Sequence, residues 1–368
     1  MKWQIKFKKQ RAGNSNGWTR CGALATPDGA SPGSPTLLPA HRINKPNCAS
    51  MKKPALYKKA AFFTITAAIL LLALAVTISY QTKYRPTDRA VSDARISTLN
   101  EFTKTVKDDM ERGLYISSFR AIMSMEEFIT TKGTLLNDSK LSFREAVTIG
   151  TISNQSMSLM QQSTFPDWVA RINSKATETG LIANFSVNSL EISHKNPWTL
   201  LIESNISANI TDNIGTASFI FNETIKAEIS ITGLEDPTFS SHTQGKIIRT
   251  VNGTTYEGNY ASGTDTTNLR KHIDGNYYAN STSAPSFLMR LEGNYNSSAY
   301  GIESFVSVPD LQQKGITQYK RSMIDYVYFG NLSTSGLYKI NNTYEPWLII
   351  DEAHLDKYQV RSIASQMG

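Results

Sequence analysis

The stretch that decides the fold is "KKAAFFTITAAILLLALAVTISYQTKYR", at residues 58–85. It contains no charged residue between Lys59 and Lys83. Its apolar part runs from Ala60 to Tyr80, and a helix of this length reaches about 30 Å, the thickness of the hydrocarbon core of a bilayer. The sequence therefore predicts a transmembrane helix at residues 60–80.

The flanks of the apolar run indicate that the helix is retained and which way it points. A cleaved secretory signal has a shorter apolar region, about 7–15 residues, followed by small residues, and "TISYQTKYR" offers no such site. Four lysines lie in the basic flank at residues 51–59, whereas three basic residues and Asp88 follow the run. This bias predicts a cytoplasmic N-terminus, with the bulk of the chain extracellular. A buried helix of a soluble protein is the alternative.

Residues 1–50 form a leader rich in Gly, Pro, Ser and Asn, without a sustained helical or strand period. Such a composition is typical of disorder. Met51 begins a complete export signal of its own, with lysines followed by the apolar run. We therefore expect Met51 to be the true start, so that residues 1–50 are not part of the mature protein. A genuine cytoplasmic tail is the alternative.

Charge and cysteine content are uneven along the 368 residues. Residues 1–90 contain 15 basic and 2 acidic side chains, and the remaining 278 residues contain 23 basic and 29 acidic ones. A nucleic-acid partner is excluded, because a phosphate groove needs clustered Lys and Arg on the folded part. Both cysteines, Cys21 and Cys48, precede the apolar run. The larger part of the chain is thus held together without disulfides.

Eleven Asn-x-Ser/Thr sequons follow the apolar run, more than the composition gives by chance. In a secreted chain such a sequon marks an exposed site for N-glycosylation. A polar surface without sugar is the alternative. The asparagines are Asn137, Asn154, Asn184, Asn205, Asn209, Asn222, Asn252, Asn280, Asn296, Asn331 and Asn341.

Residues 91–178 have a helical period and predict a stalk region. Apolar residues recur every three or four positions from Ile96 to Leu114 and continue at Ala121, Met125 and Phe128. We expect Pro86 to break or kink the preceding helix, and a further break near Gly113. Core packing of this apolar stripe is favoured over packing between subunits. Two more helices are expected, at residues 142–161 and 167–177.

Residues 181–368 predict an antiparallel, β-rich extracellular domain, which makes the fold class α+β. "ANFSVNSLEI", "WTLLIESNISANI" and "IKAEISI" alternate with period two, and the first shifts phase between Val187 and Leu190. Turn signals at Asn196-Pro197, Asp212-Asn213 and Gly233 separate them. Later apolar segments include "SFLMRLEGNY", "YGIESFVSV", "SMIDYVYF" and "PWLIIDEAHLDKY".

Chemical motifs are few, and we expect no catalytic site, cofactor or metal. "DEAH" at residues 351–354 lacks the phosphate-binding loop of a helicase. Asp351 and His354 are spaced to share a metal, with Glu303 or Asp325 completing the site, but a cap and a surface contact are the favoured interpretation. "GLEDP" at residues 233–237 predicts a strand-ending turn.

The residues 51–80, with the stalk and the Thr/Asn-rich β region behind them, resemble type IV pilins and pilin-like surface proteins of archaea. In that family a basic residue followed by Gly or Ala marks the processing site. The resemblance therefore implies Lys59 and Ala60 at this site, with cleavage before Ala61. The Glu found at the fifth position of the mature helix in bacterial-type pilins is replaced by Ile65. The "GLEDP" turn is similar to that of other archaeal exported proteins.

The sequence thus predicts a non-enzymatic, single-pass cell-surface protein, either a pilin-like subunit or a pilus-associated component. Its partners are the membrane and other surface or pilus subunits. A membrane-anchored ligand-binding or sensory ectodomain is the first alternative. A secreted hydrolase with a site built from acidic residues such as Glu303 and Asp325 is the second.

Overall fold

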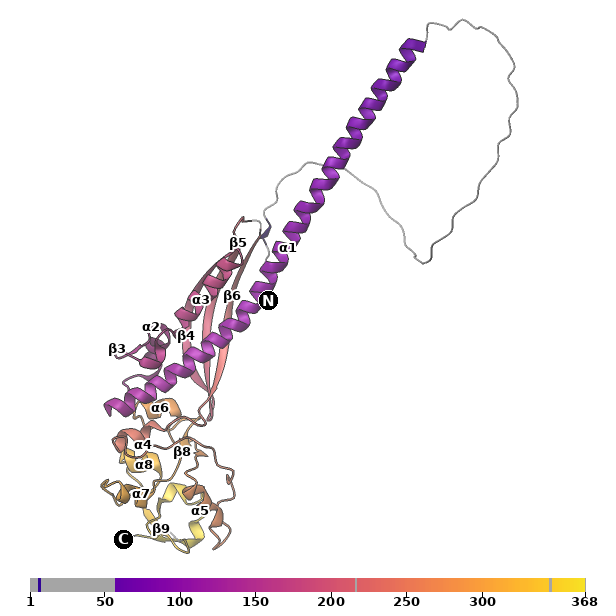
Figure 1. The fold of residues 1–368 in the computed structure, drawn as a ribbon. Helices are drawn as coiled ribbons and strands as arrows, with labels where there is room; N and C mark the ends of the chain where they lie inside the picture. Colours follow the sequence, from indigo (N-terminus) through magenta and orange to yellow (C-terminus); the bar gives the residue numbers. More distant parts are fainter. Residues whose placement is uncertain (1–5, 8–56, 216, 344–345, 368) are drawn as a thin grey trace, which may run out of the picture. The chain divides into compact units, whose positions relative to one another are not determined.

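The computed structural model describes residues 6–7, 57–215, 217–343 and 346–367. The chain forms two compact units: Lys8–Ala94, and Arg95–Gly368 together with Met1–Phe7. The secondary structure is a mixture of helices and antiparallel strands (Figure 1), which confirms the α+β class. The predicted leader beyond Lys6–Phe7 lies outside the described residues.

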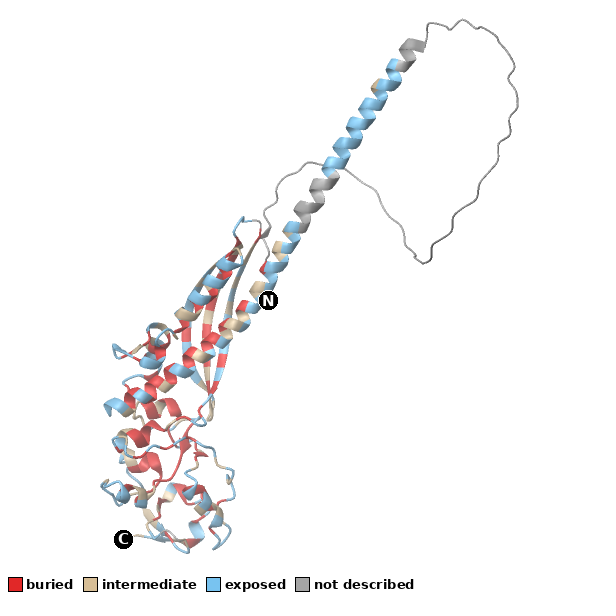
Figure 2. Ribbon diagram, in the orientation of Figure 1, coloured by how far each residue is buried: buried red, intermediate tan, exposed pale blue. Residues whose placement is uncertain are grey.

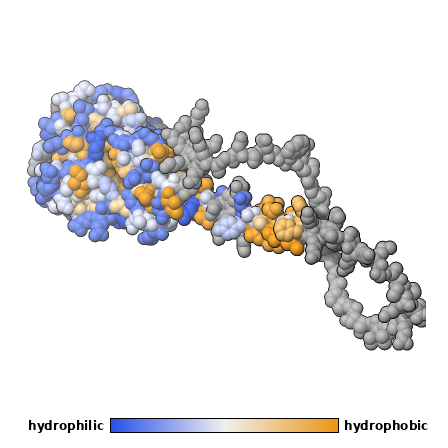
Figure 3. Space-filling view, turned by 90° about the horizontal axis from the view of Figure 1, so that it is seen from above, coloured by the Kyte–Doolittle hydropathy of each residue, from blue (hydrophilic) through white to orange (hydrophobic). Residues whose placement is uncertain are grey.

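Helix α1 extends from Tyr57 to Lys132. Its segment Phe62–Gln81 has a mean hydropathy of 2.4, and none of it is buried (Figures 2 and 3). Among the described residues this is the one helix long and apolar enough to cross a membrane. It lies within two residues of the predicted span. Lys59, Ala60 and Ala61 lie near the start of α1, and their side chains are outside the described residues.

The predicted helix breaks do not occur, because α1 continues through both Pro86 and Gly113. Proline fixes φ at a helical value and removes one main-chain hydrogen bond, so it need not end a helix. Gly113 has a packing role: a Cβ here would lie 2.3 Å from Cδ1 of Trp168. The indole Nε1 donates to the Asp109 carbonyl at 2.9 Å. Glycine therefore makes room for Trp168 against the helix.

Three long strands form an antiparallel meander in the order β6-β5-β4. Two tight turns join them at the predicted positions. The predicted change of phase is a β-bulge between Val187 and Ser189. The short strand β1 pairs with the outer edge of β6 at Ser218 and Ala217. The strands are β1 (Lys6–Phe7), β4 (Leu181–Asn196), β5 (Thr199–Asp212) and β6 (Ala217–Ser230).

The core lies between one face of this sheet and the helices. The stripe predicted on α1 is buried there, including Leu99, Val106, Met110 and Leu114. Helix α3 (Phe165–Glu178) begins with a capping box formed by Thr164 and Asp167. The packing of the stripe inside the chain confirms the core interpretation.

Helix α2 (Ser139–Ile149) is shorter than predicted. Gly150, with φ of 81°, accepts the left-handed conformation that ends it. The rest of the predicted helix instead forms the strand pair β2 (Thr151–Ile152) and β3 (Gln155–Ser156) and the turn η1 (Ser158–Met160).

Beyond Ser230 the chain differs from the β-rich domain predicted. Short helices and short strands are joined by irregular segments around a second apolar core. The apolar segments "SFLMRLEGNY" and "SMIDYVYF" are largely buried and contain short helices, because a short apolar run does not by itself distinguish strand from helix. The elements are α4 (Pro237–His242), α5 (Thr267–Asp274), β7 (Ala279–Asn280), α6 (Phe287–Leu291), β8 (Ile302–Glu303), α7 (Val308–Gln313), α8 (Asp325–Gly330), β9 (Leu337–Ile340), β10 (Ile349–Asp351), η2 (Glu352–His354), η3 (Arg361–Ile363) and β11 (Ala364–Gln366).

Candidate functional site

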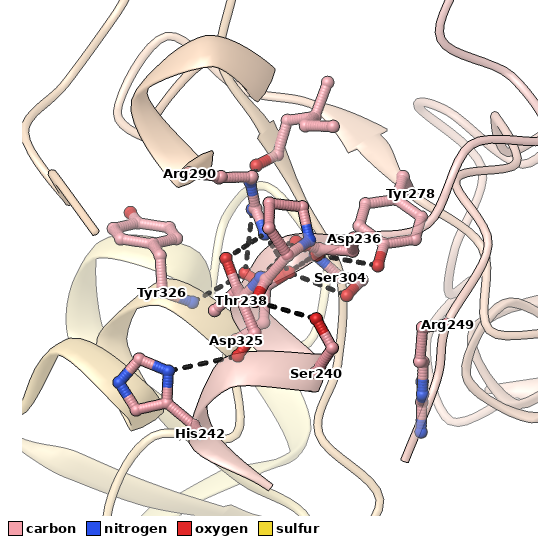
Figure 4. Close-up of polar contacts among 12 residues, drawn as sticks. Asp236, Thr238, Ser240, His242, Arg249, Tyr278, Arg290, Ser304, Asp325 and Tyr326 are labelled. Atoms are coloured by element: carbon pink, nitrogen blue, oxygen red, sulfur yellow. Dashed lines mark hydrogen bonds and ion pairs between the residues drawn. The ribbon is translucent and has the colours of Figure 1, made fainter. Parts of the chain in front are cut away.

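The core of the C-terminal region contains an ion network centred on Arg290 of α6 (Figure 4). Its guanidinium donates to Asp236 Oδ2 at 2.7 Å and to both oxygens of Asp325, at 3.1 and 3.2 Å. It also donates to the Ile302 carbonyl. Arg290, Asp236 and Asp325 have no exposed surface. The network therefore joins α4, α6 and α8, which are far apart in the sequence.

Each carboxylate of this network has further donors. Asp236 accepts from the Tyr278 hydroxyl at 2.8 Å and caps α4 by accepting from the Thr238 amide. Asp325 accepts from the amide and the hydroxyl of Ser304 at 3.0 and 2.7 Å. The predicted "GLEDP" turn is thus a structural corner, with Gly233 at φ of 90°. Asp236 of this turn is also part of the ion network.

Burial and neighbouring charges act in opposite directions on these groups. Burial lowers the pKa of Arg290, but the two carboxylates raise it above its ordinary value. Burial raises the pKa of Asp325 above its usual range, although Arg290 opposes the shift. Two carboxylates thus share one buried cation, and that cation is held charged.

A second buried cluster surrounds His354. Its Nδ1 lies 2.7 Å from Asp351 Oδ1, and its Nε2 lies 3.5 Å from Glu303 Oε2. Glu303 also contacts the Lys357 ammonium at 2.8 Å and accepts from the Tyr358 hydroxyl. Burial lowers the pKa of His354, but the two carboxylates raise it to about 9. Burial raises the pKa of Glu303, but His354 and Lys357 lower it to about 2.

The structure brings together three of the residues considered for a metal site, but in a different role. Asp351, His354 and Glu303 are neighbours, whereas Asp325 belongs to the Arg290 network. A metal ligand must be a neutral imidazole, and here each ring nitrogen faces a carboxylate. No group of three His, Cys, Asp or Glu suited to a metal occurs in the described part of the chain. These side chains form ion pairs.

The two carboxylates considered for a hydrolase site also form buried ion pairs. Glu303 and Asp325 have no exposed surface, and each is paired with a cation. A general acid or base must reach the substrate directly or through one water. Neither group is placed to do so.

Sequence reasoning missed Arg290, Tyr278 and Lys357. A signal was present in the apolar segments, where a single charge interrupts each run, as in "FLMRL" and "SMIDYVYF". Since a charge is rarely buried without a partner, an isolated charge in an apolar run indicates an internal ion pair. The sequence does not show which charge pairs with which, because the partners are 35 to 54 residues apart.

The described surface is hollowed on both sides of α1. A groove of about 620 Å³ lies between α1 and β6, with Phe219 and Phe221 as its apolar wall. The Lys107 ammonium contacts Glu223 at 2.6 Å in this groove. A smaller groove, about 320 Å³, lies between α1 and α3 beside Trp168. These grooves can receive an apolar side chain or a small ligand with polar ends.

The sequon asparagines fall into two groups. Nine are exposed, whereas Asn205 and Asn280 are half-buried. Four of the eleven, Asn184, Asn205, Asn209 and Asn222, lie on strands β4 to β6. Comparison of the chain with family models, with curated proteins and with solved structures gave no match.

Proposed function

We propose that this protein is a membrane-anchored cell-surface component of the pilin-like kind, either a filament subunit or a pilus-associated protein. The observation that carries the proposal is helix α1. One helix supplies both the apolar segment Phe62–Gln81 and the buried stripe from Leu99 to Ile129 on which the sheet packs. The proposed anchor and the first helical segment of the folded part thus belong to one helix.

The chemistry of the folded part supports a non-enzymatic role. The buried charges around Arg290 and His354 are paired with one another. Paired polar groups in a buried network rigidify and specify a fold, and these have little or no exposed surface to offer a substrate. These ion pairs connect distant segments of a domain that has no disulfides to connect them.

The anchored topology has a consequence for β1. Residues on the two sides of a membrane-spanning helix lie on opposite faces of the bilayer, so Lys6–Phe7 cannot reach β6 once α1 is inserted. In the inserted protein the outer edge of β6 is therefore free of β1. This holds whether residues 1–50 are a cytoplasmic tail or translation starts at Met51.

A ligand-binding ectodomain is the second candidate, and the groove between α1 and β6 favours it. Its volume of about 620 Å³ is in the range of small-molecule sites, and Phe219 and Phe221 supply apolar surface. A ligand that binds there stabilises the folded protein by mass action. A rise in melting temperature with a screened compound, lost in Phe221→Asp, would support this function.

Electron microscopy of native cells tests the first candidate. We expect antibodies raised against residues 95–368 to label surface filaments, or their base, and a deletion strain to lose the label. N-terminal sequencing of the mature protein decides between Met51 and Ala61 as the first residue. Label confined to the cytoplasm in lysed cells would contradict the proposal.

A further inference from the structure

The exposed face of the three-stranded sheet gathers sequons from all three strands. In an antiparallel meander, residues i and i+2 point to the same face, so each sequon places its asparagine and its hydroxyl residue together. The middle residues Phe185, Ile206 and Ile210 point to the helix side, and the last two are buried. Asn184, Asn205, Asn209 and Asn222 therefore all lie on the face opposite the helices.

The register brings these asparagines close to one another. Asn184 lies directly opposite Asn209, and Asn222 lies opposite Ser207. Facing residues in such a pair have Cβ atoms about 4.5–5.5 Å apart. The same face exposes two apolar side chains, Ile182 at 53% and Ile220 at 59%. Ile220 lies directly opposite Asn209.

The four asparagines differ in how free their side chains are. Asn184, Asn209 and Asn222 are exposed. Asn205 is half-buried, accepts from Asn188 at 2.8 Å, and donates its Nδ2 to Thr224 at 3.4 Å. On another element, Asn280 is half-buried on β7, its side-chain oxygen is fully enclosed, and its carbonyl accepts from Lys357. The Asn280 side chain therefore has little room for a sugar in the folded domain.

We propose that the outer sheet face is an N-glycosylated surface, with Asn184, Asn209 and Asn222 as the acceptors and Asn205 and Asn280 as unmodified sequons. The donor is a lipid-linked sugar activated by phosphate or pyrophosphate. The bond between Asn Nδ2 and the anomeric carbon forms, the bond from that carbon to the phosphate oxygen breaks, and Nδ2 loses one proton. The side chains of Asn184, Asn209 and Asn222 are exposed in the folded domain and can accept the sugar there, whereas those of Asn205 and Asn280 are half-buried.

Sugars at these positions have a physical effect on the surface. An open sheet face with exposed isoleucines and a free edge at β6 is a template for pairing with other chains. Glycans are bulky and solubilising, and a sugar on Asn209 covers Ile220. The outer sheet face is thereby closed to protein contacts, which are directed to the side of α1. This inference rests on the proposed extracellular placement.

The test is glycopeptide mass spectrometry on the full chain purified from its native membrane. We expect sugar mass on peptides that contain Asn222 and on at least one of the facing pair Asn184 and Asn209. Peptides with Asn205 and Asn280 should be unmodified. Thr224→Ala should remove the sugar from Asn222, and Ser207→Ala, the matched control in the sequon of Asn205, should leave the total mass of sugar unchanged.

Two results would overturn the inference. One is a sheet face without sugar, which would mean that a polar strand surface alone explains the N-x-S/T spacing. The other is sugar on Asn280 or Asn205 at an occupancy similar to that of Asn222. Digestion of intact cells by added protease is measured in parallel. If the domain is accessible but Asn184, Asn209 and Asn222 are bare, this inference fails while the surface role stands; an inaccessible domain rejects both.

Discussion

Replacing Arg290 by methionine removes the cation that the described residues place between Asp236 and Asp325. Both carboxylates then stay in a fully buried environment without a counter-charge. Removing one partner of a buried ion pair costs about 3–5 kcal/mol, because the remaining charge is uncompensated. We expect a loss of this size in the free energy of unfolding at pH 7. In melting temperature this corresponds to a decrease of about 10 °C.

The loss should depend on pH in a defined direction. Burial raises the pKa of Asp325, and without Arg290 the largest opposing influence is removed, so its pKa lies above that of the unfolded chain, about 3.9. A raised acid pKa means that stability is retained at low pH and lost as pH rises. The difference in the free energy of unfolding between Arg290→Met and the original chain should therefore become smaller toward pH 4. Urea unfolding of the full chain in detergent, at several pH values, measures it.

Arg361→Met is the matched control. Arg361 also contacts two carboxylates, those of Asp356 and Glu352, but its side chain is 49% exposed. Surface pairs of this kind contribute little, so the control should unfold almost as the original chain does. The triple variant Asp236→Asn, Arg290→Met, Asp325→Asn should recover most of the loss. A loss below about 1 kcal/mol for Arg290→Met, or one independent of pH, would refute the reasoning.

Three further predictions concern packing and titration. Gly113→Ala should destabilise by about 1–3 kcal/mol despite the better helix propensity of alanine, because the new methyl collides with Trp168; unchanged urea unfolding would contradict this. His354, with its pKa raised to about 9, should stabilise the fold below pH 6.5 by roughly 3 kcal/mol. That contribution should disappear by pH 9 and be absent from His354→Gln. Burial raises the pKa of Glu126 to about 8, so the free energy of unfolding should fall between pH 4.5 and 8. Thermal melts of Glu126→Gln should show a weaker dependence of the melting temperature on pH over this range.

The elements nearest the anchor were readable from the sequence because their signals are local. Period-two alternation predicted β4 to β6, and the change of phase after Val187 is the bulge itself. The helix predicted at residues 167–177 begins within two residues of the start of α3. The stripe from Leu99 to Leu114 predicted the buried face of α1. In each case neighbouring residues determine the structure.

The short elements of the C-terminal region could not be predicted from the sequence, because contacts between distant residues determine them. Its helices are five to eight residues long, too short for a period to show. They are held by contacts between distant residues, such as Arg290 with Asp236 and Asp325. Gly113 was predicted to break the helix because the residues near it in the sequence do not show its contact with Trp168, which lies 55 positions later. Tertiary contacts here override local preference.

Labelling of cysteines on intact cells tests the central claim, that α1 spans the membrane and residues 95–368 lie outside. The native cysteines, Cys21 and Cys48, both precede α1 and serve as internal controls if the leader is present. A new cysteine at the exposed position Ser335 reports on the folded part. The account predicts that a membrane-impermeant maleimide modifies Ser335→Cys on intact cells and reaches Cys21 and Cys48 only after lysis. Labelling of Ser335→Cys only after lysis would contradict it.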